Sequence, residues 1–146
     1  MTMKRITIDH YQKLSIVQDI ICECPCDSDD IVFDRDTRTV TIPFEREMHE
    51  ERILARQGVL LNHWVCPVKR LLLTVHHVVD CTINDACQIG RIDLATLEYD
   101  NDKMRLTLSS SFPFRFELSV SAIELTIEDR DIVIRSRHLR LLRWLS

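Results

Sequence analysis

Apolar and polar residues alternate along the second half of the chain in a pattern that predicts β-strands. Every second residue is apolar in residues 104–108 and 114–120, and the same spacing returns in residues 123–127. A period of two places the apolar side chains on one face of a strand and the polar side chains on the other. We therefore expect strands with one buried face and one solvated face, which is typical of antiparallel sheets.

Polar segments separate these strands and predict turns. Residues 100–103, 109–113 and 128–131 are rich in Asp, Asn or Ser, whose side chains hydrogen-bond to nearby backbone groups and favour turns. Two earlier apolar runs, residues 70–83 and 92–99, have the Leu, Val and Ile content of further strands. A series of strands joined by short turns predicts an antiparallel meander.

The first 67 residues contain fewer clear elements. Residues 31–42 predict a β-hairpin, because two runs rich in Val and Ile flank a turn-forming segment. Residues 11–21 carry an apolar stripe at helical spacing, with Asp9 as a candidate N-terminal cap. Residues 45–57 consist largely of helix-forming residues and stop at Gly58, so we expect a surface helix or an ordered loop there.

Together these elements predict a mainly β fold, with an α+β fold as the alternative. We expect an antiparallel meander that is closed as a small barrel or arranged as a two-sheet sandwich, because both arrangements leave fewer exposed strand edges. One or two short helices belong to the N-terminal half. Since no linker, repeat or low-complexity segment interrupts the chain, we expect residues 1–146 to form a single domain.

The composition excludes several classes of functional site. With only two glycines, Gly58 and Gly90, the chain cannot form a Walker phosphate loop, a dinucleotide-binding turn or a nucleophile elbow. The 19 basic and 23 acidic residues give a formal net charge of −4, and both halves of the chain are slightly acidic. We therefore expect no nucleic-acid partner, because such a partner requires a basic surface.

The apolar runs and the cysteines bear on the cellular compartment. No apolar run reaches the ~18 residues of a membrane span, and the first residues do not have the pattern of a signal peptide. We therefore expect a cytoplasmic protein, in which thiols stay reduced. The six cysteines are then free thiols rather than a disulfide framework: Cys22, Cys24, Cys26, Cys66, Cys81 and Cys87.

Three cysteines within five residues form the least ordinary segment of the chain. Cys22, Cys24 and Cys26 are of the residue type that binds zinc. In a strand, side chains two residues apart on one face are roughly 6.5–7 Å from each other, whereas thiolates that share one zinc approach to about 3.8 Å. We therefore expect a turn with partly buried thiols and predict no cofactor, and we keep zinc at these three cysteines as the alternative.

Among the carboxylates, Asp80 is the candidate catalytic residue, because it lies inside an apolar run. A buried carboxylate is unfavourable unless it is paired, and strongly shifted acids cluster at functional sites. The alternative is that Asp80 lies on the solvated face or binds the neighbouring backbone. We do not expect His76 and His77 to bind one metal ion, because alternation along a strand sends their rings to opposite faces.

The C-terminal segment combines basic and apolar residues. Residues 132–146 contain four arginines and no acidic residue, interleaved with leucines and Trp144. Leucines at this density are rarely left in water. We therefore predict that residues 138–145 dock on the protein itself or on a second copy of the chain.

None of these residues or motifs is sufficient to indicate catalysis or a bound cofactor. We therefore expect a small binding or regulatory module, or an oligomer-forming module, without catalysis. Its partner would be another protein or a second copy of the chain, and we expect neither a nucleic acid nor a membrane as partner. The alternative is a metal-binding protein, or a metal- or thiol-dependent enzyme, centred on Cys22, Cys24 and Cys26.

Overall fold

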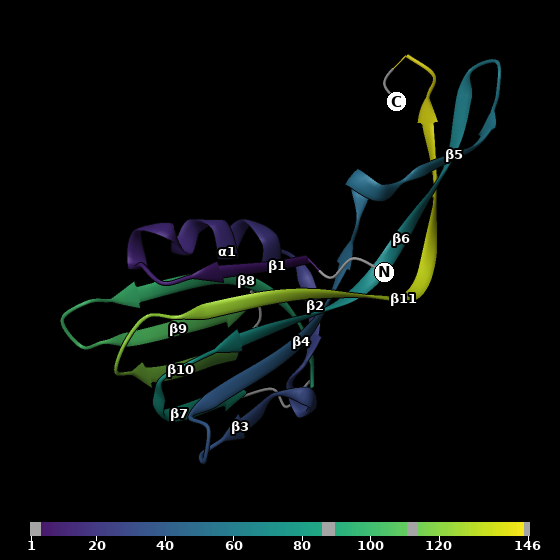
Figure 1. Cartoon of the computed structure of the whole chain (residues 1–146). Helices are drawn as coiled ribbons and strands as arrows, with labels where there is room; N and C mark the ends of the chain where they lie inside the picture. The colour runs from purple at the N-terminus through teal and green to yellow at the C-terminus, as the bar shows by residue number, and fades with distance from the viewer. Residues whose placement is uncertain (1–3, 86–89, 111–113, 145–146) are drawn as a thin grey trace.

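The computed structural model describes residues 4–85, 90–110 and 114–144, which form two antiparallel β-sheets and one short helix (Figure 1). The sheets face each other across a shared hydrophobic core, as in a sandwich, and they do not close into a barrel. The prediction of a mainly β sandwich is confirmed, whereas its barrel alternative is wrong. Among the described residues, no helix is both long enough and apolar enough to cross a membrane.

The larger sheet contains six strands. Their bounds are β1 (Lys4–Ile8), β3 (Val32–Asp34), β4 (Thr39–Glu47), β5 (Ile53–Gln57), β6 (Leu61–Val75) and β11 (Leu125–Leu142). The order across the sheet is β1, β11, β6, β4 and β3, and β5 also pairs with β6. β4 and β5 occupy successive stretches of the same long neighbour, because β4 pairs with residues 68–75 of β6 and β5 with residues 62–65.

The smaller sheet contains five strands and the helix lies beside it. The bounds are β2 (Cys24–Asp27), β7 (Val78–Asp85), β8 (Arg91–Asp100), β9 (Arg105–Ser110), β10 (Phe114–Val120) and α1 (Leu14–Ile21). The order across this sheet is β2, β8, β9, β10 and β7. Gln18 ties α1 to β8, since its Oε1 accepts a hydrogen bond from the backbone N–H of Leu97 at 3.3 Å.

Alternation along the strands decides which side chains fill the core. Two facing strands bury every second residue, namely Phe114, Phe116, Leu118 and Val120 of β10 and Val40, Ile42 and Phe44 of β4. The inward register expected for residues 114–120 is therefore confirmed.

The helix expected at residues 11–21 is also confirmed. A 3-10 turn (Tyr11–Lys13) leads into α1, whose apolar stripe of Leu14, Val17 and Ile21 is buried. The N-terminal cap is His10, whose Nδ1 accepts a hydrogen bond from the backbone N–H of Gln12 at 3.2 Å. The expectation that Asp9 is the cap is therefore wrong.

Residues 45–57 do not form the expected surface helix. They contain the end of β4, a 3-10 turn at His49–Glu51 and the whole of β5. β5 pairs with β6 in antiparallel register, with Ile53 opposite Val65. Pairing with a long neighbouring strand outweighs helix propensity, which amounts to less than about 1 kcal/mol per residue. Gly58 therefore lies at the tip of a hairpin rather than at the end of a helix.

Residues 128–131 do not turn the chain back. β11 continues from Leu125 to Leu142, but its pairing with β6 is irregular between Asp129 and Ile132, and Asp131 has a φ of 60°. The polar run that predicted a turn is therefore a β-bulge inside one long strand. Ser109 and Ser110, expected to belong to a loop at residues 109–113, lie in β9, and residues 111–113 lie outside the described part of the chain.

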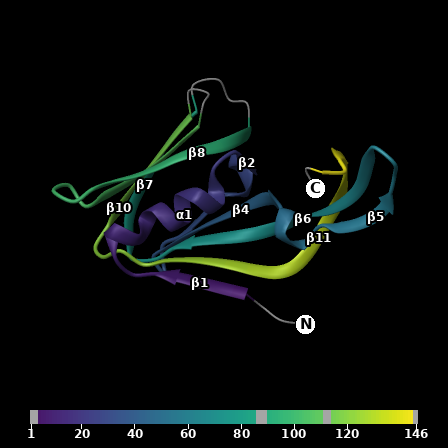
Figure 2. The same ribbon diagram turned by 90° about the horizontal axis from the view of Figure 1, so that it is seen from above.

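β5 and the outer parts of β6 and β11 extend away from the rest of the molecule (Figures 1 and 2). We call residues 52–66 and 132–144 the arm, and all other described residues the body. β11 pairs with β6 along the arm and ends with Leu142 opposite Leu61. Residues 138–142 therefore dock on β6 of the same chain, which is one of the two alternatives predicted for this segment.

Candidate functional site

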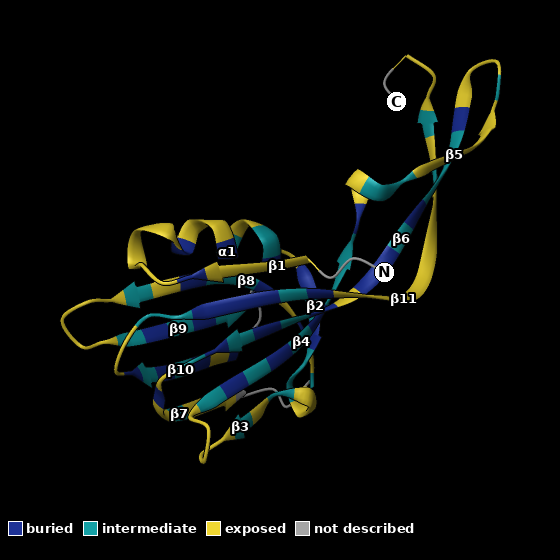
Figure 3. Ribbon diagram, viewed as in Figure 1, coloured by how far each residue is buried: buried dark blue, intermediate teal, exposed yellow. Residues whose placement is uncertain are grey.

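The arm carries most of the exposed hydrophobic surface. Ten of the 17 large hydrophobic side chains that are exposed among the described residues belong to it, and Figure 3 shows it mostly in the colour of exposed residues. They are Ile53, Leu54, Val59, Leu60, Leu61, Ile132, Val133, Ile134, Leu142 and Trp144. Large exposed apolar patches on soluble proteins usually mark interaction sites. The arm is therefore the candidate functional site.

The tip of the arm joins the β5–β6 hairpin to the end of β11. The backbone N–H of Gly58 donates to the carbonyl oxygen of Leu61 at 2.9 Å and closes the hairpin. The backbone N–H of Arg143 donates to the carbonyl oxygen of Leu60 at 2.8 Å. This second bond brings Trp144, which is 70% exposed, next to the hairpin. Two segments about 80 residues apart in sequence thus form one apolar tip.

The arm is also the basic part of the molecule. It contains six of the 19 basic residues and none of the 23 acidic ones, so it carries a formal charge of +6 and the rest of the chain carries −10. At its base, Arg135 pairs with Glu45 at 3.0 Å and Arg137 pairs with Glu47. Arg52 also lies at this base, with its guanidinium 4.7 Å from the centre of the Trp64 ring, and Arg56, Arg140 and Arg143 lie further along the arm. The near balance of charge over the whole chain conceals this separation.

An ion cluster around the buried Lys69 lies in the body at the base of the arm. Lys69 is only 4% exposed, and its Nζ lies 2.7 Å from Glu51 Oε1, 2.6 Å from Asp131 Oδ1 and 3.6 Å from Asp129 Oδ2. Burial alone would lower the pKa of Lys69, but the hydrogen bonds that its Nζ donates to the carboxylates of Asp131 and Glu51 raise it above its ordinary value. Lys69 is therefore charged at neutral pH and holds together the bulge in β11 and the segment that leads into β5.

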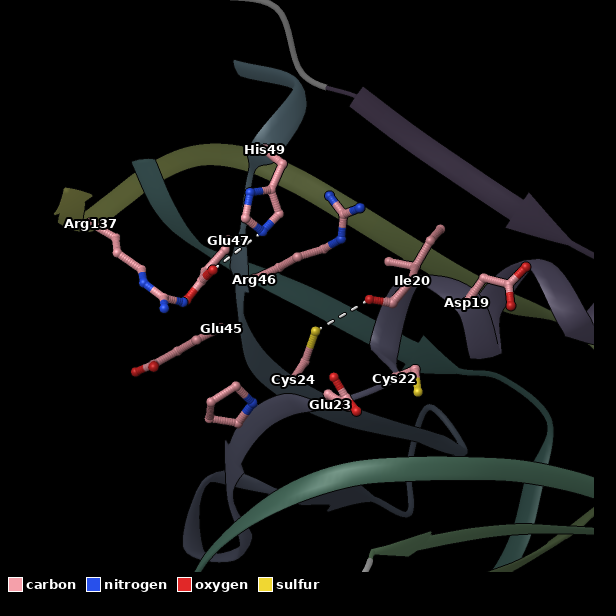
Figure 4. Close-up of a pocket in the computed structure, with 11 residues that line it drawn as sticks. Asp19, Ile20, Cys22, Glu23, Cys24, Glu45, Arg46, Glu47, His49 and Arg137 are labelled. Atoms are coloured by element: carbon pink, nitrogen blue, oxygen red, sulfur yellow. Dashed lines mark hydrogen bonds and ion pairs between the residues drawn. The ribbon is translucent and has the colours of Figure 1, made fainter. Parts of the chain in front are cut away.

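A hollow of about 380 Å³ opens at the base of the arm, beside α1 (Figure 4). Charged side chains of both signs line it, and its cationic side chains are paired with carboxylates. Glu47 Oε2 lies 3.3 Å from His49 Nε2, and Arg46 Nη1 lies 2.8 Å from Glu50 Oε1. No cationic side chain in the described lining of this hollow is therefore left unpaired for an anionic ligand.

Cys66, His49 and Glu47 lie next to one another at the base of the arm, so that a thiol, an imidazole and a carboxylate form a row. His49 Nδ1 lies 4.0 Å from Cys66 Sγ, and His49 Nε2 lies 3.3 Å from Glu47 Oε2. A cysteine nucleophile requires a thiolate that a substrate can reach. Cys66 is fully buried, and burial together with the charges of Glu47 and Glu50 raises the pKa of its thiol. The arrangement is therefore structural and lacks the properties of a nucleophile.

The structure separates the three cysteines considered as zinc ligands. Cys24 and Cys26 lie on the buried face of β2, where their thiols donate to the carbonyl oxygens of Ile20 at 3.3 Å and of Asp27 at 3.6 Å. Cys22 is exposed at the end of α1. Burial raises the pKa of Cys24 to about 11 and that of Cys26 to about 12. The segment expected as a turn is a strand, and its two inward thiols behave as core residues.

Among residues 4–85, 90–110 and 114–144, no group of three or more His, Cys, Asp or Glu side chains is arranged to hold a metal ion. His76 and His77 nevertheless lie on one side, since both approach Glu124, with N–O distances of 4.0 Å and 3.1 Å. The expectation that they face opposite sides is wrong, because they form the turn between β6 and β7, where His77 has a φ of 57°. Cys87 lies outside the described residues.

Asp80 is exposed on β7. Its carboxylate accepts a hydrogen bond from the backbone N–H of Cys81 at 2.9 Å. This is the placement given as the alternative for Asp80, and it provides no burial that would favour a catalytic role.

No family model, no curated protein and no solved structure matches the chain. The candidate site therefore rests on the residues and their geometry.

Sequence reasoning recognised only one half of the arm. The arginines and leucines of residues 132–146 indicate a segment that docks, whereas the pattern of residues 45–57 predicts a surface helix or an ordered loop. The signal that could have joined the two halves is their shared lack of acidic residues, because residues 52–66 contain none either.

Proposed function

We propose that the protein is a binding module that assembles through its arm, and that its partner is a second copy of the same chain. The observation that carries this proposal is the arm itself, with its uncovered apolar side chains on three strands. Burial of apolar surface contributes roughly 25 cal/mol per Å². An arm that stays in water forgoes this stabilisation, whereas one that packs on a partner gains it.

The edges of the arm support the same proposal. β1 pairs with β11 only at residues 125–129, so among the described residues no strand covers the outer edge of β11 along the arm. The outer edge of β5 is equally uncovered within the described chain. Unpaired edges present backbone N–H and C=O groups that a strand from another chain can bind.

Charge favours a second copy as the occupant. The arm carries +6 and the rest of the chain −10, so each copy presents both a basic arm and an acidic body to its partner. Exposed carboxylates such as Asp29, Asp36 and Asp102 are available on the body. Opposite potentials on two surfaces guide their encounter and select the partner.

The alternative of a metal- or thiol-dependent protein has less support. It requires the cysteines of residues 22–26 to act together, and two of them are core thiols with raised pKa values. We also propose a cytoplasmic location, and the free thiols of the described cysteines support it, since a reducing compartment keeps thiols in this form.

The experiment is to measure molar mass in solution by light scattering and sedimentation over a range of protein concentrations. We expect the average mass of the wild-type chain to exceed that of the 17.2 kDa monomer and to rise with concentration toward that of a dimer. Val59→Asp should return it to the monomer, because Val59 at the arm tip is 87% exposed and a charge there opposes apolar packing.

Val32→Asp is the matched control, because Val32 is 55% exposed on β3 of the body and the change in side chain is the same. We expect this variant to keep the wild-type mass. A wild-type chain that stays monomeric at every concentration would refute the proposal, and so would two variants that lose assembly equally.

A further inference from the structure

A second hollow lies on the arm close to its tip. Its volume is about 300 Å³, and its lining consists of Arg56, Gly58, Leu61, Asn62, His63 and Arg140. No carboxylate belongs to this lining, in contrast to the hollow at the base of the arm. A hollow that is lined by cationic and neutral groups alone favours an anionic occupant.

Three of these residues form one row across the arm. His63 of β6 lies opposite Arg56 of β5 on one side and opposite Arg140 of β11 on the other. Residues directly opposite each other in antiparallel strands share a face of the sheet, so the two guanidinium groups flank the imidazole. Strand pairing therefore places the three groups together without any loop.

The two flanking arginines are not engaged elsewhere. Arg56 and Arg140 form no ion pair with any described residue, whereas Arg135 and Arg137 at the base of the arm are paired with glutamates. His63 is held by its neighbour His138, with 2.9 Å between His63 Nε2 and His138 Nδ1. The row thus offers two free guanidinium groups around an imidazole that a second ring orients.

We propose that this hollow binds a phosphate group through Arg56, His63 and Arg140. The planar fork of a guanidinium group donates two parallel hydrogen bonds to a phosphate, and two such forks on opposite sides of one imidazole match a group with several acceptor oxygens. The proposal does not depend on self-association, because each row belongs to one chain.

The phosphate has two chemical sources that the structure accommodates. It could belong to a small soluble phosphate compound, or it could belong to a phospholipid headgroup. The exposed side chains of Val59 and Leu60, next to Gly58 in the hairpin, would face the acyl region in the second case. The two sources share the same three side chains, and separate probes distinguish them.

The test is titration calorimetry with inorganic phosphate at low ionic strength, together with flotation of the full chain on vesicles of phosphatidylglycerol and phosphatidylcholine. Arg56→Gln combined with Arg140→Gln removes both guanidinium forks and keeps a neutral polar side chain at each position. We expect saturable binding by the wild-type chain and a loss of about tenfold or more in the double variant, since each hydrogen bond to a charged group contributes appreciably.

The matched control combines Arg70→Gln with Arg115→Gln, because both side chains are exposed on the body and the change in net charge is the same. We expect this control to bind as the wild-type chain does. Binding of phosphate identifies a soluble source, and binding of vesicles alone identifies a lipid source. The proposal is overturned if neither probe binds, or if the two double variants lose binding equally.

Discussion

Cys24 and Cys26 donate their thiols to backbone carbonyl groups inside the core, while Cys22, next to them in sequence, is exposed. Burial raises the pKa of Cys24 to about 11 and that of Cys26 to about 12, so both remain protonated at neutral pH. The thiolate is the form that reacts with electrophiles and binds metals. At the scale of single residues, three adjacent cysteines therefore have different chemistry because their surroundings differ.

The first prediction follows from this difference. Iodoacetamide should alkylate Cys22 rapidly in the native protein, and it should modify Cys24 and Cys26 only after unfolding. Site-resolved mass spectrometry of timed samples measures the three rates. Cys22→Ser should remove the fast modification from residues 22–26. Equal native rates at the three positions would contradict the buried placement of β2.

Lys69 is also buried, but it keeps its charge, because ion pairs with carboxylates compensate the cost of burying it. Replacement of Lys69 with Met should lower the free energy of unfolding by about 1–3 kcal/mol at neutral pH, because it leaves the buried carboxylate of Asp129 without its cation, while Glu51 and Asp131 reach solvent. Arg70→Met is the control. It removes an exposed arginine 3.5 Å from Asp30 and should lower the free energy of unfolding by less than about 1 kcal/mol. Urea unfolding measures both.

The pH dependence of the Lys69 cluster has a definite sign. The raised pKa of Lys69 means that its stabilisation is complete below its ordinary pKa and is lost as the pH rises through the higher folded value. The Lys69 hydrogen bond lowers the pKa of Asp131, so the stabilisation from Asp131 is present above its ordinary pKa and is lost at more acidic pH. The difference in free energy of unfolding between the wild-type chain and Lys69→Met should therefore become smaller in acid, because the unpaired carboxylates of the variant take up protons.

At the scale of elements, the β5–β6 hairpin depends on one glycine. A Cβ atom at Gly58 would lie 2.3 Å from the carbonyl oxygen of Leu61, which is the oxygen that accepts the Gly58 N–H. Gly58→Ala should therefore open the tip while the body stays folded. Hydrogen exchange should rise at residues 53–65 and stay unchanged in β9 and β10. Unaltered exchange at the tip would contradict the hairpin geometry.

The local pattern of apolar and polar residues was sufficient to predict those elements whose structure depends mainly on their own residues. Alternation in residues 114–120 and the apolar stripe in residues 11–21 identified β10 and α1, because each buries its own apolar face. Residues 45–57 and 128–131 could not be read in this way. Their structure depends on pairing with β6 and on Lys69, and the strength of such partners is not visible in the segments themselves.

Prediction of the candidate site from sequence had the same limit, because it too depends on contacts between distant segments. Asp80 and the cysteines of residues 22–26 stood out by residue type, yet their surroundings give them ordinary structural roles. The row of Arg56, His63 and Arg140 draws on three separate strands. No spacing along the chain indicates it, because only the register of β5, β6 and β11 brings its members together.

At the scale of the whole molecule, the basic arm and the acidic body predict how assembly responds to salt. At physiological ionic strength the Debye length is about 8 Å, so charges further apart than this interact only weakly, and added sodium chloride shortens this distance. The association constant measured by sedimentation should therefore fall as sodium chloride is added. Arg140→Glu should weaken association at low salt and flatten this dependence. An association constant that is independent of salt would show that charge does not contribute.

The pairing of β1 with β11 also determines when the fold can be completed. Each residue of β1 pairs with a residue at least 117 positions later, from Ile8 with Leu125 to Lys4 with Asp129. A ribosome adds about 5–20 residues per second, so β1 waits roughly 6 to 23 seconds after its own synthesis before its partner exists. The strands β7 to β10 pair mostly with neighbours in sequence and can form during that interval. The larger sheet, and the arm with it, is therefore completed only after β11 has been made, although β3, β4, β5 and β6 can pair with one another earlier.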